Sequence, residues 1–191
     1  IPVALSTSPP ACEPPVRRNI VLLHNDEVAI GRQGAQHFLS RGQFRSFGFV
    51  PTNVPYYCSI LRHEGFDARL HETAANAFKY LQPSLKDGSP EDINALTDWL
   101  KQLPKPTAVM AVHDLRATHV LDAARESGLK IPDDLVVIGV DNDELLCDFT
   151  EPQLTSIFPD HVYEGELAAR ELRRMLSRPD SWKHSKTVRS R

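Results

Sequence analysis

The chain has 191 residues, of which 41% are hydrophobic and 25% are charged, and its formal net charge is −3. This is the composition of an ordinary globular domain, and it excludes disordered and fibrous proteins. A slightly acidic balance provides no overall basic surface for nucleic acid, so any DNA contact is expected to come from a domain outside this chain.

Five short runs rich in Val, Ile, Leu and Phe predict β-strands. Most of them lack polar alternation, as expected of strands that are covered on both faces. Amphipathic segments lie between them, and this alternation predicts an α/β fold with parallel sheets flanked by helices. The runs occupy residues 1–5, 20–23, 46–50, 108–112 and 135–140.

Helices are predicted first where apolar residues recur at helical spacing between Val28 and Leu39, with Gly42 as the stop. A second helix is expected to begin after Ser89 as N-cap. Pro90 occupies its first turn, and Asp92 stands at the capping-box position.

A third helix is expected over about residues 115–127, and Gly128 follows as its end. A fourth carries apolar residues over 165–176, with Asp160 before it as a candidate cap. Residues 181–191 are basic and lack helical periodicity, so we expect a frayed end or a linker there.

Two of the predicted strands each lead to an aspartate, Asp114 after His113 and Asp141 directly after Val140. Ligands of open α/β sheets bind beyond the carboxyl ends of the strands, so both carboxylates are expected at one crevice. A carboxylate accepts strong hydrogen bonds from two adjacent sugar hydroxyls. The alternative is that Asp114 caps the following helix and Asp141 shapes a turn.

Arg62 lies on a helix expected after the 46–50 strand, where its planar fork can donate two hydrogen bonds to a ligand in the same crevice. The alternative is an ordinary surface arginine. The eight histidines show no H-E-x-x-H spacing, and residues 141–152 lack the Gly and Glu of a calcium loop. The usual nucleotide, dinucleotide and hydrolase motifs are also missing. We therefore expect neither an enzyme nor a cofactor or metal.

The three cysteines, Cys12, Cys58 and Cys147, are widely spaced and form no C-x-x-C pair. This argues against a disulfide framework or a structural zinc site. The sequence shows no signal-peptide pattern and no apolar run near the ~18 residues of a membrane span. A cytoplasmic protein is expected, and the start at Ile1 indicates a piece of a longer one.

Eight stretches of the chain resemble, in the same order, the effector domains of the lactose/galactose repressor family, which share the type I periplasmic-binding-protein fold. The resemblance extends from about Ile1 to Met175. The stretches are Ile1-Pro2-Val3, Arg62-x-x-Gly65-Phe66, Pro106-Thr107-Ala108-Val109, Ala111-Val112-His113-Asp114, residues 128–134, Val137-Ile138-Gly139-Val140-Asp141, Pro152-x-Leu154-Thr155-Ser156 and the 165–176 helix.

This resemblance implies roles for particular residues. The arginine of the family's R-x-x-G-F motif corresponds to Arg62, its acidic or amide residue after the next matching strand to Asp114, and its aspartate after G-[FY] to Asp141. With the neighbouring His113 and Asn142, these residues form the expected ligand-binding set.

The chain departs from the common pattern at two motifs, and both departures resemble the xylose-operon regulators. His113-Asp114-Leu115-Arg116-Ala117 replaces N-D-x-M-A, and residues 139–144 replace G-[FY]-D-D. The resemblance implies D-xylose or a related monosaccharide as effector. It also implies a DNA-binding domain that is not in this chain and a homodimeric full-length protein.

The family's fold implies two lobes with the sugar in the cleft between them. The first lobe is expected to comprise residues 1–45 and a returning helix at 161–178, and to be truncated because the family's domain begins before Ile1. Residues 46–155 are expected to form the second lobe, and 179–191 a basic tail or linker. The alternative with the same fold is a periplasmic sugar-binding receptor of a transport system.

Overall fold

The computed structural model describes residues 3–6, 20–75, 77–177 and 186–189 of the chain. Its strands form two sheets in which every pairing is parallel. The smaller sheet has the order β1-β2-β8, and the larger has the order β4-β3-β5-β6-β7. The strands are β1 (Val3–Ser6), β2 (Ile20–His24), β3 (Ser46–Val50), β4 (Ala77–Lys79), β5 (Thr107–Ala111), β6 (Leu135–Val140), β7 (Thr155–Ile157) and β8 (Lys186–Arg189).

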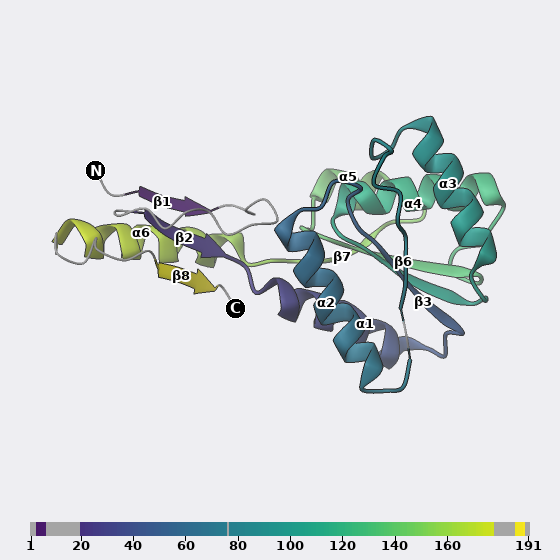
Figure 1. Cartoon of the computed structure of the whole chain (residues 1–191), viewed down its shortest axis with the longest axis horizontal. Coiled ribbons are helices and arrows are strands. Elements are labelled where there is room, and N and C mark those ends of the chain that lie inside the picture. The colour runs from purple at the N-terminus through teal and green to yellow at the C-terminus, as the bar shows by residue number, and fades with distance from the viewer. Residues whose placement is uncertain (1–2, 7–19, 76, 178–185, 190–191) are drawn as a thin grey trace.

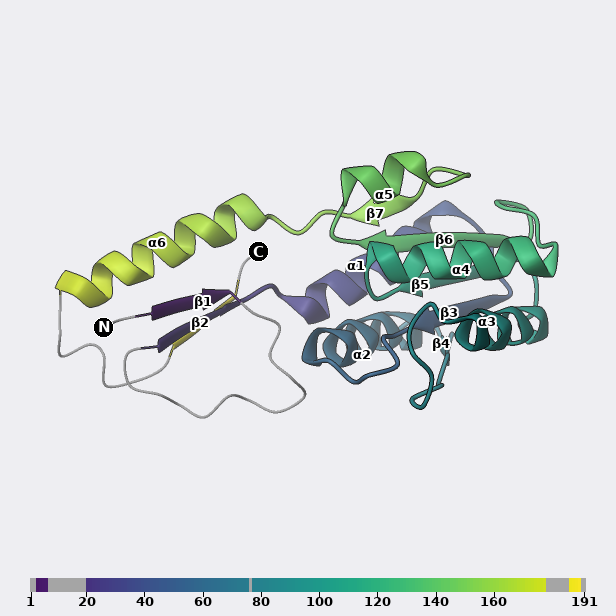
Figure 2. The ribbon, with the colours of Figure 1, turned by 90° about the horizontal axis from the view of Figure 1, so that it is seen from above.

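Six helices of the described chain accompany these sheets. Figure 1 shows the smaller sheet with the last helix at one end of the molecule and the larger sheet with the other helices at the opposite end. Figure 2 shows this last helix lying along the smaller sheet. The helices are α1 (Glu27–Arg41), α2 (Tyr57–His71), α3 (Pro90–Gln102), α4 (Asp114–Ser127), α5 (Glu144–Phe149) and α6 (His161–Ser177).

The larger sheet is buried on both faces because successive side chains of a strand point to opposite sides. On β5, Ala108 and Met110 belong to the core beneath α1 and α2, whereas Val109 and Ala111 belong to the core beneath α3 and α4. The same alternation holds along β3 and β6. The expected parallel sheet with helices on both faces is confirmed.

Helices α1 and α2 cross at two glycines. A Cβ at Gly31 would lie 2.0 Å from the carbonyl oxygen of Arg62, and a Cβ at Gly65 would lie 2.0 Å from that of Val28. The two backbones therefore touch, and Phe66 is fully buried beside the crossing. The glycine of the R-x-x-G-F stretch, Gly65, thus allows α1 to pack directly against α2 near Arg62.

The helix ends largely follow the sequence. The Ser89 hydroxyl accepts a hydrogen bond from the Asp92 N–H, Asp160 caps α6 through the Tyr163 N–H, and Gly128 ends α4 with a left-handed φ of 72°. Gly42 ends α1 in an extended conformation. The capping-box interpretation of Asp92 is wrong, because its buried carboxylate accepts bonds from Tyr80, Asn53, Gly88 and Arg116 instead.

Three short strands differ from the expectations. β4 and β7 each have three residues and no apolar run, so hydrophobic patterning does not reveal them. Within the 181–191 segment, expected to be a frayed end or linker, Lys186–Arg189 is a strand paired with β2. The pairing of this segment depends on a partner strand far away in the sequence.

The packing of α1 differs from the expected division at residue 45. Its side chains Ile30, Ala35 and Phe38 belong to the core of the larger sheet, although residues 1–45 were assigned to the first lobe. The smaller sheet has its own core, in which Val21 and Leu23 of β2 pack against α6. No helix among the described residues has the length and apolar character needed to cross a membrane.

Candidate functional site

The larger sheet changes direction at the carboxyl ends of β3 and β5, which is where the sequence predicts the ligand crevice. From β3 the chain runs outward to β4, and after β4 it crosses back to β5 and continues toward β7. The helices that follow β3 and β5, α2 and α4, cover opposite faces of the sheet. Such a switch in direction opens the space in which α/β proteins bind ligands.

Arg62 enters this crevice from α2 and is only 5% exposed. Its Nε donates to Glu27 Oε2 at 2.6 Å, and its Nη1 donates to the backbone carbonyl of Val112. Its Nη2 lies 3.7 Å from Asp141 Oδ1. The alternative of a surface arginine is therefore wrong: the side chain is buried, and two of its nitrogens are fixed within the chain.

Asp141 follows β6 and has a φ of 106°, an uncommon and strained conformation for a residue other than glycine. Its N–H donates to the Ile157 carbonyl, and the next N–H, of Asn142, donates to the Ser156 hydroxyl. Burial raises the pKa of Asp141 to about 6, even though the charge of Arg62 acts to lower it. The turn thus holds a carboxylate beside Arg62 that does not ionise as readily as a solvated one.

The carboxylate of Asp114 contacts the turn that contains Asp141 and Asn142, and it also contacts β7. One oxygen accepts from the Ser156 hydroxyl at 2.6 Å, and the other accepts from the Asp143 N–H at 2.8 Å. The residue is 1% exposed, and burial raises its pKa. A Cβ at Gly139 would lie 2.1 Å from Asp114 Oδ1, so this glycine makes room for the carboxylate.

His113, and not Asp114, is the N-cap of α4, so the capping interpretation of Asp114 is wrong. The His113 Nδ1 accepts from the Arg116 N–H at 3.0 Å, which places the ring proton on Nε2 in the neutral form. Burial, followed by the charge of Arg62, lowers the pKa of His113 to about 4. The imidazole is therefore neutral near pH 7 and presents an N–H donor.

The structure thus brings the expected residues to one end of the larger sheet. Arg62 and Asp141 form an ion pair, and Asp114 supports the turn that carries Asp141 and Asn142. His113 follows β5 next to the Val112 carbonyl that Arg62 contacts.

Three further buried charged residues, Glu27, Asp92 and Arg116, are paired near these side chains, and the sequence does not predict their positions. An acidic residue in the first turn of a helix ordinarily interacts with the helix dipole. Nothing in the sequence therefore indicates that Glu27 and Asp92 form buried ion pairs instead. Arg116 was visible only as a departure from the N-D-x-M-A pattern. Their burial and pairing depend on the tertiary fold.

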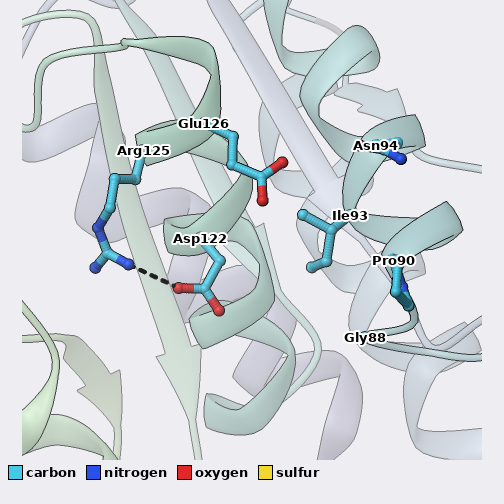
Figure 3. Close-up of a pocket in the computed structure, with 7 residues that line it drawn as sticks. All are labelled: Gly88, Pro90, Ile93, Asn94, Asp122, Arg125 and Glu126. Carbon is cyan, nitrogen blue, oxygen red and sulfur yellow. Dashed lines mark hydrogen bonds and ion pairs between the residues drawn. The ribbon is translucent and has the colours of Figure 1, made fainter.

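A separate hollow of about 400 Å³ lies between α3 and α4 (Figure 3). Its charged side chains are solvent-exposed, and Asp122 and Arg125 pair with each other at 3.1 Å. None of the five expected ligand-binding residues lines it. Its lining consists of Gly88, Pro90, Ile93, Asn94, Asp122, Arg125 and Glu126.

The part of the chain that the structure describes contains no group of three His, Cys, Asp or Glu side chains arranged to hold a metal ion. The crevice instead combines one cationic fork, one partly exposed carboxylate and one neutral imidazole. Such a set can donate and accept several hydrogen bonds at once, which is what a polyhydroxylated molecule requires.

Comparisons with known proteins find relatives in sequence and solved structures with a similar fold. The xylose operon regulatory protein of Haemophilus influenzae is 30% identical over 156 residues, covering 80% of this chain and 40% of that protein. The transcriptional regulator CelR in complex with cellobiose has a TM-score of 0.75 at 19% identity, covering 99% of this chain and 56% of that one. A LacI family regulator from Enterococcus faecium with bound ribose has a TM-score of 0.71 at 23% identity, covering 90% and 61%.

These solved structures share the fold, and the chain spans less than half the length of the Haemophilus relative. The model of the periplasmic binding protein-like domain matches residues 35–190, which is most of the sequence. A xylose operon regulator is among its relatives in sequence, and LacI-family regulators share its fold. The chain therefore belongs to the family of periplasmic binding protein-like domains.

Proposed function

We propose that this chain is the sugar-binding effector domain of a bacterial transcription regulator. The observation that carries the proposal is the pairing of Arg62 with Asp141 in the crevice, across 3.7 Å. A sugar hydroxyl can donate to the carboxylate while a neighbouring hydroxyl accepts from the guanidinium. Both bonds involve a charged partner and are about twice as strong as neutral ones.

The bonds within the chain suggest how the roles are divided. Arg62 is held by Glu27 and the Val112 carbonyl, so its Nη2 is the nitrogen directed toward Asp141 and the ligand. The His113 Nε2–H adds a neutral donor. We assign direct contacts to Arg62, His113, Asp141 and Asn142, and a supporting contact through the turn to Asp114.

Two connections join the sheets, one between β2 and α1 and the other between β7 and α6 (Figure 2). In our proposal, a sugar bound at Arg62 and Asp141 stabilises one relative arrangement of the two sheets. A ligand shifts such an equilibrium only by its difference in affinity for the two arrangements. The change would be passed to a DNA-binding domain outside this chain.

D-xylose is the favoured effector, because the Haemophilus relative is named as a xylose operon regulator. The ribose in the Enterococcus faecium structure indicates that pentoses suit this fold. A periplasmic transport receptor is the alternative with the same architecture. It is less favoured because the relatives compared above are named as regulators.

Isothermal titration of the full-length protein with D-xylose, L-arabinose, D-ribose and D-glucose tests the proposal. We expect one pentose to bind selectively and Asp141→Ala to weaken its binding by about tenfold or more, the loss of one charge-assisted hydrogen bond. Asp122→Ala, an exposed carboxylate on α4, is the matched control and should bind like the wild type. Silence toward all four sugars, or equal affinity in Asp141→Ala, would contradict the proposal.

A further inference from the structure

Besides the Arg62–Glu27 contact, a second buried ion pair joins α3 and α4. Arg116 of α4 and Asp92 of α3 both have fully buried side chains and form a two-pronged contact: Nη1 donates to Oδ2, and Nη2 donates to Oδ1 at 3.1 Å. Arg116 also lies over the ring of Tyr80, 5.5 Å from its centre. A bidentate, planar contact of this kind fixes both side chains in orientation as well as in distance.

The pair holds the turn that follows β3. Arg116 Nε donates to the carbonyl of Pro51 at 3.0 Å, and Asp92 Oδ1 accepts from the Asn53 side-chain amide at 2.9 Å. The Asn53 N–H donates to Asp87 at 2.8 Å, so this turn is tied to the loop before α3 as well. Residues 51–53 are buried, and exposed Val54 and Tyr56 follow them.

This turn and the first turn of α4 flank the crevice. Residues 51–53 leave the carboxyl end of β3, and His113 leaves the carboxyl end of β5, the two strands between which the chain changes direction. Arg116 joins these two segments, the walls of the crevice, because its backbone N–H donates to the His113 ring and its side chain donates to the Pro51 carbonyl.

The charges in this cluster are well compensated. Burial by itself raises the pKa of Asp92, but hydrogen bonds from Arg116, Asn53 and the Gly88 N–H outweigh it and bring the pKa to about 2. Asp92 therefore stays ionised near pH 7. Buried ion pairs add little stability compared with apolar residues of similar size, so a role in fixing geometry is the better explanation.

We propose that Arg116, clamped by Asp92, is a positioning residue of the sugar crevice, which locks the Pro51–Asn53 turn against the start of α4 before the ligand arrives. The inference rests on the proposed sugar-binding function. Pre-arranging a wall lowers the entropy that the ligand must otherwise remove on binding, so loss of the clamp is expected to weaken binding even where the fold survives.

The test removes both charges at once, because removal of one would leave the other buried and unpaired. In Arg116→Met/Asp92→Asn the linear Met replaces the stem of Arg116, and the Asn oxygen still accepts from neighbours. Arg125→Met/Asp122→Asn is the matched control, since it removes an exposed ion pair from the same helix. Arg116→Lys is a milder variant that keeps the charge and loses the fork.

Two readouts on the full-length protein separate positioning from general stability. In the double variant we expect amide hydrogen exchange of Asn53 to quicken by about tenfold while that of Val109, in the central strand β5, is unchanged. Titration with D-xylose, L-arabinose, D-ribose and D-glucose should show affinity for the bound sugar reduced by about tenfold. Arg116→Lys should move both readouts in the same direction, and the control pair should move neither.

Unchanged Asn53 exchange, or unchanged affinity in a folded variant, would overturn the proposal. Equal acceleration at Asn53 and Val109 would also overturn it, because the pair would then act on the whole fold. If the double variant does not fold, Arg116→Lys decides by the same criteria. If the wild type binds none of the four sugars, the proposed function fails, while Asn53 exchange still decides whether Arg116 fixes this wall.

Discussion

Asp141 has an unusual backbone conformation and a carboxyl group with a raised pKa. The φ of 106° directs the residue out of the line of β6, and burial raises its pKa to about 6. Strained backbone of this kind persists only where surrounding bonds impose it. Here the Ile157 carbonyl accepts from the Asp141 N–H, and the Ser156 hydroxyl accepts from the Asn142 N–H. The carboxylate of Asp114 accepts from the Asp143 N–H in the same turn.

The raised pKa gives sugar binding a pH dependence with a definite sign. If Asp141 accepts hydrogen bonds as a carboxylate, binding needs the ionised form. With a pKa of about 6, this form predominates above about pH 7 and is a minor fraction at pH 5. The affinity measured by titration should therefore be about tenfold lower at pH 5 than at pH 7. Arg62, Glu27, Asp114 and His161 face this carboxyl group and set its charge environment.

Asp141→Asn should bind more weakly than the wild type and with an affinity that no longer changes over this range. His161→Gln is the control for the neighbouring imidazole, because histidines in general change charge between pH 5 and 8. A wild-type affinity that is flat from pH 5 to pH 7 would contradict an ionised Asp141 in the contact.

The same shift affects stability in the opposite direction. The folded chain binds the Asp141 proton more tightly than the unfolded chain does, since the folded pKa is the higher one. The contribution of Asp141 to stability is therefore fully present below the ordinary aspartate pKa of about 3.9 and is lost as the pH rises through about 6. As the pH rises through about 6, ionisation of Asp141 is thus expected to strengthen sugar binding and to lower the stability of the fold.

The sequence predicted Arg62, Asp114 and Asp141 as ligand-binding residues because strand ends can be read along the chain and because the family resemblance implies their roles. The supporting partners were not accessible in this way. Glu27 lies 35 residues from Arg62, and Asp92 lies 24 residues from Arg116. Which acid meets which arginine depends on how α1, α2, α3 and α4 pack, and no short-range pattern records it.

At the scale of elements, the crossing of α1 and α2 sets the position of Arg62. Gly31 and Gly65 allow the helix backbones to touch, and Glu27 and Arg62 meet next to this contact. The orientation of the arginine therefore depends on a close approach that only glycine permits.

Gly65→Ala should destabilise the chain, because the added Cβ would lie 2.0 Å from the Val28 carbonyl oxygen and would force the helices apart. We expect a loss of ~1–3 kcal/mol in the free energy of unfolding, the usual cost of overpacking, measured by urea denaturation. Gly165→Ala in α6 is the control: its Cβ meets nothing within 4 Å, so helix propensity should make it stabilising by ~0.5–1 kcal/mol. A neutral Gly65→Ala would contradict the packing described here.

Hydrophobic patterning predicted the long elements well and the short ones poorly. β3, β5 and β6 have five or six mostly apolar residues, and α3 and α4 carry clear start or stop signals. The strands β4 and β7 have three residues each, too few to show a period. β8 has four residues in a basic segment, and its pairing with β2 is not encoded locally.

At the scale of the whole molecule, two large apolar side chains of the short helix α5 are exposed. Leu145 is 70% exposed and Phe149 is 84% exposed, and they lie four residues apart on one face of the helix. Exposed apolar groups of this size often mark contacts between proteins.

In the proposed function, a sugar binds at the carboxyl ends of β3, β5 and β6, in contact with Arg62 and Asp141. A crystal structure of the full-length protein with the sugar selected by titration is the decisive measurement. We expect sugar hydroxyls within hydrogen-bond distance, roughly 2.5–3.2 Å, of the Arg62 guanidinium and the Asp141 carboxylate. A sugar located in the hollow between α3 and α4, or anywhere that leaves the Arg62–Asp141 pair untouched, would rule out this binding site.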